Sequence, residues 1–379
     1  MNKTQVIQKD SNTKESNLYM AMELSDKKWK LAFSDGSKER LRTIDAGEII
    51  ELWKEIANAK EKFGLEEDAK VISCYEAGRD GFWIHRCLLS NGIDNNVIDP
   101  ASVEVDRRRR RKKTDRLDAK KLLMALMRYM WGDKQACSIV RVPSIKDEDE
   151  RQLHRELESL KKERTRHSNR IRALLISHGI RIENPGRRDF KRYLDSIRLW
   201  DGSEISKNLK ERLNREHDRY SQVEDQIKEL EGVRKRLVRD KESESMSRVR
   251  QMLKLKGIGI ESSWLLEKEF FGWRKFKNGK EVGSLSGLSP TPYSSGDSNR
   301  EQGISKAGNR RVRAMIVEIS WIWIRFQKES KLTKWFNERF ANGGKRMRRI
   351  GIVAVARKLL IDIWRYLEHG VIPEGAVVS

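Results

Sequence analysis

Two carboxylates three residues apart, Asp115 and Asp118, stand at the start of a segment whose apolar residues recur at near-helical spacing. A helix there places both acids on one face. Two acids held together repel each other unless a cation lies between them, and Mg²⁺ is a hard ion that prefers carboxylate and phosphate oxygens. The pair is therefore predicted to be half of a metal site for phosphodiester chemistry. The alternative is that Asp115 only caps the helix and Asp118 is a solvated first-turn acid, since acids are favoured at helix starts.

A run of seven basic residues stands directly before this pair. Its members are Arg107, Arg108, Arg109, Arg110, Arg111, Lys112 and Lys113. Such a run can be only a solvated charged segment, but its position before the acids favours contact with the backbone of DNA or RNA. Contacts of this kind would make the affinity strongly dependent on salt.

The composition also favours a nucleic-acid partner. The 379 residues include 80 Lys and Arg against 57 Asp and Glu, a net charge of +23. That excess favours a polyanion, nucleic acid before membrane. No apolar run is long enough to span a bilayer, and the polar N-terminus lacks a signal-peptide core, so no membrane partner is expected. Three cysteines without metal-binding spacing indicate a reducing cytosol and no zinc site.

The chain is long enough for two or three domains. Residues 1–17 are polar and expected to be disordered. Residues 18–145 predict a mixed α/β domain in the order three strands, helix, strand, helix, strand, helix, with the first three strands forming a meander. The predicted strands cover residues 19–24, 29–34, 40–44, 69–75 and 95–99, and the predicted helices cover 47–63, 80–91 and a segment beginning at Asp115.

Two further acids fall at useful points on this sheet. Glu23 lies near the end of the first strand and Glu76 at the end of the fourth. Strand ends and helix starts can converge on one edge of an α/β sheet. Four acids there could hold two Mg²⁺ ions, one activating an attacking oxygen and one stabilising the leaving oxygen. The alternatives are a solvated strand-end acid for Glu23 and a turn residue before Gly78 for Glu76.

Residues 146–247 are highly charged and predicted to be helical, with helices over 148–179 and 204–240. In the second helix, apolar residues at spacings of three, four and seven form a heptad-like seam. The seam residues are Leu209, Leu213, Tyr220, Val223, Ile227, Leu230 and Leu237. The seam could close an intramolecular helical hairpin or form a dimerising coiled coil.

Residues 248–379 are predicted to form a mainly helical domain. A Gly-x-Gly turn at 257–259, before a helix over 262–270, could offer backbone N–H groups to a phosphate. Ser294 and Ser295 lie in a polar loop that exposes hydroxyls on flexible backbone, although a serine in such a loop is ordinarily only a loop residue. The basic residues beyond this loop could hold phosphates; they are Lys306, Arg310, Arg311 and Arg313.

The end of the chain contains a basic stretch at 343–349 and then an amphipathic segment from Ile352 to Leu367. The basic stretch is predicted to be a loop that faces nucleic acid. The amphipathic segment is predicted to be a helix that completes the packing of the C-terminal domain.

These motifs together resemble the DEDD-type transposases of bacterial insertion sequences, the recombinases guided by a bridge RNA. The segments that carry the resemblance are 22–25 (Met-Glu-Leu-Ser), 75–78 (Tyr-Glu-Ala-Gly), 113–119 (Lys-Thr-Asp-Arg-Leu-Asp-Ala) and the string from Gly287 to Arg313. The resemblance covers residues 19–325. It implies an RNase H-like N-terminal domain of the Holliday-junction-resolvase type, a coiled-coil linker used in assembly, which favours dimerisation, and a C-terminal transposase domain.

The resemblance also assigns site residues. It implies that Glu23, Glu76, Asp115 and Asp118 bind Mg²⁺. The first acid of the family is usually Asp in a Gly-Ile-Asp-Val context; here it is Glu23, one methylene longer, with Asp26 nearby as a substitute ligand. The nucleophile falls on Ser295, with Ser294 as the alternative.

The serine would attack a DNA phosphate and form a transient phosphoserine link. A hydroxyl at its free pKa is a poor nucleophile, and no His lies near it in sequence. The Mg²⁺–carboxylate site is therefore expected to activate it, from the same or another subunit.

The expected function is that of a Mg²⁺-dependent transposase of an insertion sequence, cleaving and exchanging DNA strands. The expected partners are the DNA of the element ends and target, a guide RNA, and further copies of the chain as a dimer that forms a tetramer on DNA, in the cytoplasm at the nucleoid. One rival is a structure-specific, metal-dependent nuclease or resolvase with a water nucleophile. The other is a non-catalytic nucleic-acid-binding protein in which Glu23 marks a lost site.

Overall fold

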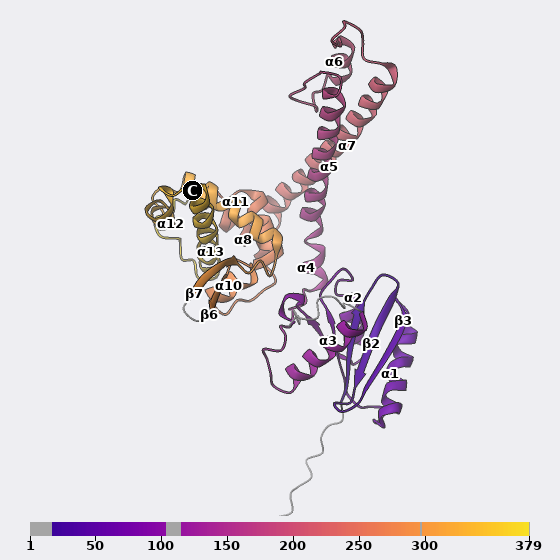
Figure 1. The fold of residues 1–379 in the computed structure, drawn as a ribbon. Helices are drawn as coiled ribbons and strands as arrows, with labels where there is room; N and C mark the ends of the chain where they lie inside the picture. Colours follow the sequence, from indigo (N-terminus) through magenta and orange to yellow (C-terminus); the bar gives the residue numbers. More distant parts are fainter. Residues whose placement is uncertain (1–16, 104–114, 296–297, 379) are drawn as a thin grey trace, which may run out of the picture. The chain divides into compact units, whose positions relative to one another are not determined.

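The structure, a computed structural model, describes residues 17–103, 115–295 and 298–378, without the side chains of 115, 116 and 292–302 (Figure 1). The predicted disordered tail, up to residue 16, lies outside the described residues. The chain divides into two compact units, residues 1–142 and 143–379. None of the described helices is both long and apolar enough to cross a lipid bilayer.

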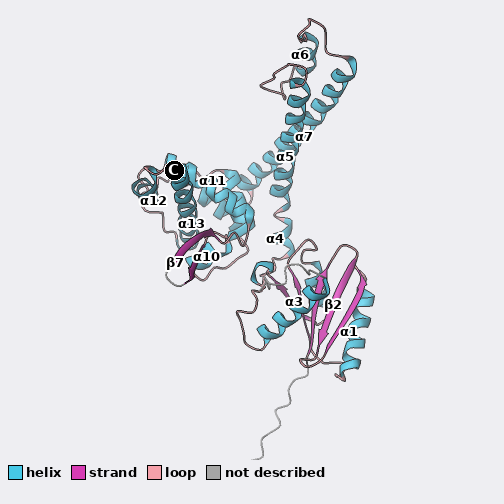
Figure 2. Ribbon diagram, in the orientation of Figure 1, coloured by secondary structure: helices cyan, strands magenta, loops and turns pink. Residues whose placement is uncertain are grey.

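The first unit contains a five-stranded mixed sheet (Figure 2). Its strands are β1 (Leu18–Leu24), β2 (Lys28–Ser34), β3 (Glu39–Asp45), β4 (Val71–Glu76) and β5 (Asp94–Ile98), in the spatial order β3-β2-β1-β4-β5. β1, β2 and β3 form an antiparallel meander, while β1 pairs in parallel with β4 and β4 with β5. The predicted order of strands and helices along the chain and the predicted meander of the first three strands are confirmed.

Helices cover both faces of this sheet. They are α1 (Ile49–Phe63), α2 (Trp83–Ser90) and α3 (Asp115–Met130), with a short 3₁₀ turn η1 at Pro100–Ser102. α1 and α2 pack on one face, against Met20 and Met22 of β1. α3 packs on the other face, against Tyr19, Ala21 and Cys74. Because successive side chains of a strand alternate between faces, the odd-numbered residues of β1 and the even-numbered residues of β4 share the α3 face.

The second unit begins with a helical hairpin. Its helices are α4 (Ile145–Asp149), α5 (Gln152–Ile176), α6 (Phe190–Ser196) and α7 (Lys207–Asp240). The single helix predicted over 148–179 is wrong at its start, because Ser144 and Asp147 form a capping box that begins a separate short helix. α5 and α7 lie side by side (Figure 1).

The heptad-like seam of α7 is buried inside the chain. Val223 and Ile227 pack against Leu157 and Leu160 of α5. Leu213 packs near the other end of the hairpin with the C-terminal part of α5 and with α6. Within this chain the seam therefore closes an intramolecular hairpin, which was one of the two interpretations, and the dimerising coiled coil favoured by the resemblance stays a prediction.

The rest of the second unit packs helices around one apolar core that includes Phe270, Trp323 and Leu360. Its elements are α8 (Glu244–Leu253), α9 (Ile260–Leu266), the π-helical turn η3 (Glu267–Phe271), α10 (Gly279–Leu285), β6 (Pro290–Ser295), β7 (Ser298–Ile304), α11 (Arg310–Phe326), α12 (Lys331–Phe336), the π-helical turn η4 (Asn337–Ala341) and α13 (Lys345–His369).

α13 confirms the predicted packing helix, since Ile352, Val355, Leu359 and Ile363 are buried. The basic stretch before them is not a loop as predicted. Its Lys and Arg residues form the exposed first turns of α13 after Gly344, because these residue types, like the alanines beyond them, are strong helix formers.

Candidate active site

Glu23 of β1 and Glu76 of β4 lie on neighbouring strands at one end of the sheet. β1 pairs in parallel with β4 up to Met22 and Tyr75, so the next residues in register are the two glutamates. Both side chains are half-buried. They line one pocket of about 360 Å³, together with Asp26. The predicted convergence of these two acids is therefore found.

Asp118 lies on the part of α3 that covers these strand ends. The rings of Tyr19, near the start of β1, and Trp131, just after α3, are 6.2 Å apart, and Cys74 Sγ lies 3.7 Å from Leu122 O. α3 therefore runs antiparallel to β1 and β4. Asp118 lies four residues before Leu122, which is about 6 Å along the helix axis. Glu76 lies two residues after Cys74, which is about 6.6 Å along the strand. Asp118 is thus level with the two glutamates, on the same face of the sheet.

The fourth predicted ligand, Asp115, is the first residue of α3, and its side chain is outside the described set. Asp118 is 19% exposed and its Oδ1 lies 3.3 Å from Lys121 Nζ. Among the described side chains, no group of three or more His, Cys, Asp or Glu residues is arranged to hold a metal ion. An ion bound by Asp118 would compete with Lys121 for this carboxylate.

The residues nevertheless fit a hard divalent cation in ligand type. Every predicted donor is a carboxylate oxygen, the ligand that such ions prefer. The pocket beside Glu23 and Glu76 supplies the space. The basic run predicted to contact nucleic acid, Arg107–Lys113, lies outside the described residues.

Ser294 and Ser295 end a β-strand. β6 pairs antiparallel with β7, with Ser294 opposite Asn299 and Ser295 opposite Ser298. The expectation of a flexible loop is wrong for both backbones, since only residues 296 and 297 stand between the last paired positions. A two-residue connection that contains glycine is the usual link of a β-hairpin, a signal that the sequence contains and that the loop interpretation missed.

The base of this serine hairpin (β6 and β7) is held by backbone contact between two segments. Ser305 N–H donates to Ser289 O at 2.9 Å and Lys306 N–H to Gly287 O at 3.1 Å. Gly287 and Gly308 have φ of 71° and 91°. A Cβ at Gly287 or Gly308 would stand 1.9 or 2.1 Å from a carbonyl oxygen of the facing segment. Glycine is therefore required at both positions.

The four basic residues predicted to hold phosphates divide into two pairs. Lys306 and Arg310 are exposed. Arg311 Nε instead donates to Glu158 Oε2 of α5 at 2.6 Å. Arg313 Nη1 donates at 3.2 Å to a main-chain carbonyl oxygen in the loop before β6. The first pair is open to a ligand, whereas the second pair holds elements of the fold together.

A buried acid that sequence reasoning missed lies behind the hairpin. Glu269 is 1% exposed. Arg155 Nε donates to it at 2.8 Å, Asn309 Nδ2 donates at 3.1 Å, and His154 Nε2 lies 3.1 Å away. Burial alone would raise the pKa of Glu269, but the hydrogen bonds from Arg155 and Asn309 outweigh it and hold the pKa below its ordinary value. The available signal was three charged residues, 267–269, inside an otherwise apolar run.

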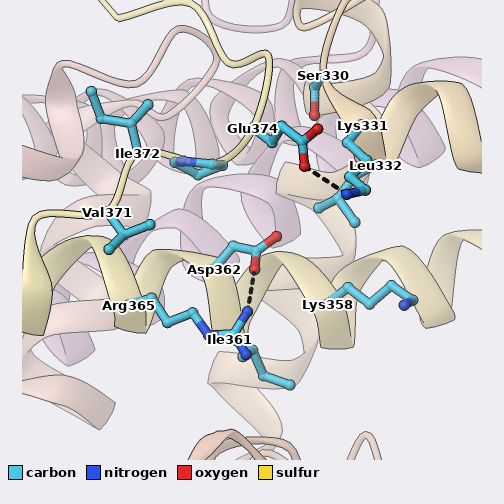
Figure 3. Close-up of a pocket in the computed structure, with 11 residues that line it drawn as sticks. Ser330, Lys331, Leu332, Lys358, Ile361, Asp362, Arg365, Val371, Ile372 and Glu374 are labelled. Atoms are coloured by element: carbon cyan, nitrogen blue, oxygen red, sulfur yellow. Dashed lines mark hydrogen bonds and ion pairs between the residues drawn. The ribbon is translucent and has the colours of Figure 1, made fainter.

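A separate pocket of about 460 Å³ lies beside α12, α13 and the C-terminal segment (Figure 3). Lys331 Nζ pairs there with Glu374 at 2.6 Å and Arg365 Nη1 with Asp362 at 3.4 Å. Burial raises the pKa of Asp362. Two acids offset two of the three cations that line this pocket, the third being Lys358. Its net charge is therefore smaller than that of the exposed pair beside the serine hairpin.

Family models match both units of the chain. Residues 249–334 match the model described as the transposase IS116/IS110/IS902 family, and residues 45–179 match the transposase model DEDD_Tnp_IS110. Glu76, Asp115 and Asp118 fall inside the second span and Ser295 inside the first, whereas Glu23 precedes both.

Individual relatives agree with these matches. The chain is 38% identical to the predicted transposase y4rJ of Sinorhizobium fredii over 378 residues, which cover 96% of this chain and 94% of that protein. It is 25% identical to the transposase for insertion sequence element IS1111A of Coxiella burnetii, covering 75% and 74% of the two chains. It is 26% identical to the transposase for IS1328 of Yersinia enterocolitica, covering 58% and 63%.

Proposed function

Because this chain belongs to the IS116/IS110/IS902 family of transposases, we propose that it moves an insertion sequence through a covalent link between Ser295 and a DNA phosphate. The observation that supports this most is the position of Ser295 at the end of a strand whose base is fixed by backbone hydrogen bonds. A nucleophile on a strand that is fixed at its base can keep its alignment with a DNA phosphate.

In this proposal, the Ser295 hydroxyl oxygen forms a bond to phosphorus while the bond from phosphorus to the departing strand oxygen breaks. The serine hydroxyl loses its proton in this step, and the departing oxygen takes one up. A hydroxyl of the second DNA end then attacks the phosphoserine, which restores the serine and joins the strands. Lys306 and Arg310, which are exposed beside the hairpin, would hold neighbouring phosphates by charge-assisted hydrogen bonds.

Glu23, Glu76, Asp115 and Asp118 would bind Mg²⁺ at the end of an RNase H-like sheet. The strand order β3-β2-β1-β4-β5 and the oxygen-only donor set support this assignment. When bound, the ion would neutralise negative charge that develops on the phosphate and the leaving oxygen. The protein's own part is to hold the carboxylates at the strand ends and to release Asp118 from Lys121.

The guide RNA and the assembly state belong to the same proposal. A net charge of +23 and the run Arg107–Lys113 support contact with RNA as well as DNA. The proposed domains are a catalytic domain over 18–145, a helical linker over 146–247 and a serine-bearing domain over 248–379. Assembly into a dimer or tetramer belongs to the proposal as well, although Val223 and Ile227 of the α7 seam already pack against α5 within one chain.

A denaturing gel tests the proposal. The full chain would be incubated with Mg²⁺, RNA transcribed from the flank of its element and end-labelled element-junction DNA, beside Ser295→Ala and Ser294→Ala. A protein-linked DNA band lost only with Ser295→Ala is the expected result. Loss only with Ser294→Ala would move the role by one residue, and cleaved DNA without a linked band in wild type would indicate a water nucleophile.

A further inference from the structure

We propose that Glu269 is a positioning residue, which ties the serine hairpin to helix α5 and thereby aligns Ser295 with the DNA phosphate. The inference rests on the proposed role of Ser295. It assigns a function to a buried charged cluster that neither the predicted metal site nor the predicted phosphate contacts use.

The cluster joins three segments that are far apart in sequence. Glu269 lies on the π-helical turn η3, and it meets His154 and Arg155 near the start of α5. Arg155 uses two nitrogens, Nε at 2.8 Å and Nη2 at 3.2 Å, so the pair is bidentate and fixed in orientation. His154 is also buried. A buried carboxylate with several partners is costly to disturb, because each partner would be left unsatisfied.

Asn309 connects Glu269 to the start of α11. Its Oδ1 accepts from Arg311 N at 2.9 Å and from Val312 N at 3.3 Å, which makes it the N-cap of the helix. Its Nδ2 donates to Glu269 Oε2 at 3.1 Å. Both ends of one short amide are therefore occupied, one by the helix start and the other by Glu269.

The backbone of the same residue leads into the serine hairpin. Asn309 N–H donates to Leu285 O at 3.4 Å, and residues 305 and 306 donate to the segment that enters β6. Arg311 adds a second tie to α5 through Glu158. Few flexible groups stand between Glu269 and the base of β6 and β7, so a displacement at Glu269 would reach the hairpin.

Alignment matters for this chemistry because a misplacement of about 1 Å in a reacting group can cost about a hundredfold in rate. Loss of the tie should therefore slow formation of the covalent link more than it weakens DNA binding. A merely structural role would instead lower stability, binding and rate together.

The chain supplies a matched control in Glu216 of α7. This acid is 3% exposed and accepts from His167 Nδ1 at 2.6 Å, Arg170 Nη1 at 2.9 Å and Arg219 Nη1 at 3.1 Å. It is the same kind of Glu-His-Arg cluster, but it joins α5 only to α7. Glu216→Gln therefore measures what loss of such a cluster does to the stability of the hairpin helices.

The experiment compares Glu269→Gln, Asn309→Ser and Glu216→Gln in the full chain with Mg²⁺, flanking RNA and junction DNA. Ser at 309 keeps a capping hydroxyl but loses the donor to Glu269. We expect the single-turnover rate of the serine–DNA link to fall by about tenfold or more with Glu269→Gln and Asn309→Ser. The DNA Kd should change by less than about twofold. Glu216→Gln should leave the rate of link formation within about twofold of wild type, even if it lowers the Tm as much as Glu269→Gln does.

Hydrogen exchange gives a second measurement that needs no activity. Backbone amides of 290–295 and 298–304 should exchange faster in Glu269→Gln and Asn309→Ser than in Glu216→Gln. Equal rates of link formation and equal exchange in all three variants would overturn the inference. A protein–DNA link that persists in Ser295→Ala would overturn the proposed function of Ser295 instead. The hydrogen-exchange rates would then test by themselves whether Glu269 holds the serine hairpin in place.

Discussion

Glu23 and Glu76 occupy matching positions on β1 and β4, because the two strands pair in parallel up to the residue before each glutamate. The two acids are 53 positions apart in the sequence, and the backbone hydrogen bonds between their strands bring them together. Asp118 lies level with them because α3 runs antiparallel to both strands. Two carboxylates thus share one pocket at this end of the sheet, while Asp118 pairs with Lys121.

The first prediction concerns these carboxylates. Glu76→Gln and Asp118→Asn should abolish cleavage of junction DNA while changing the free energy of unfolding by less than about 1 kcal/mol, since partly exposed ion pairs contribute little. Mg²⁺ should raise the Tm of wild type by mass action and leave the Tm of both variants unchanged. Normal cleavage by Asp118→Asn would support the simple helix-start role of that acid.

The second prediction separates the two pairs of basic residues. Arg310→Ala should weaken binding to DNA and reduce the slope of log K against log salt by about 1, because one phosphate contact is lost. Arg313→Ala should chiefly lower Tm, since Arg313 holds a main-chain carbonyl before β6. Titration of DNA at several salt concentrations, beside thermal melts, measures both effects, and identical salt slopes for Arg310→Ala and wild type would contradict the assignment.

The third prediction tests the glycines at the base of the serine hairpin. Gly308→Ala should lower stability by more than the roughly 1–2 kcal/mol that left-handed backbone costs a side chain, because its Cβ would stand 2.1 Å from a carbonyl oxygen. Gly303→Ala is the control, since φ there is 93° and no atom lies within 4 Å of the added Cβ. Comparable Tm values for the two variants would show that the short contact between a Cβ at position 308 and the facing carbonyl oxygen does not lower stability.

The fourth prediction concerns a buried acid outside the candidate site. Burial raises the pKa of Glu267 to about 7, although Arg248 and Lys268 oppose the shift. The folded state therefore binds this proton more tightly than the unfolded state, and stability falls as pH rises from the ordinary pKa near 4.5 to about 7. The Tm difference between Glu267→Gln and wild type should become more favourable to the variant from pH 5 to pH 8, by the equivalent of up to about 3 kcal/mol. A difference that does not change with pH would mean that Glu267 titrates normally.

Much of the first unit could be predicted from sequence because its signals are local. The buried run before Glu76 and the apolar spacing after Asp115 each specify their own element. The mixed sheet then places the strand-end acids together without further information. The depth at which α3 lies over β4 depends on packing around Leu122 and Cys74, which no local pattern specifies.

The second unit was harder to predict, for physical reasons that differ between segments. Two prolines within 290–295 favour a loop, yet backbone pairing with β7 makes this segment a strand. The seam of α7 has the same pattern whether its partner is α5 or a second chain. Glu269 is recognisable only once a π-helical turn directs it toward α5, because that contact joins residues 114 positions apart.

The most direct test of the account is to identify the residue that is linked to DNA. The adduct formed by the wild-type chain would be digested with nuclease and trypsin, and the peptide covering residues 281–300 would be sequenced by mass spectrometry. The predicted result is a nucleotide joined through its phosphate to the hydroxyl oxygen of Ser295. The same mark on another residue, or cleaved DNA with no marked peptide, would contradict it.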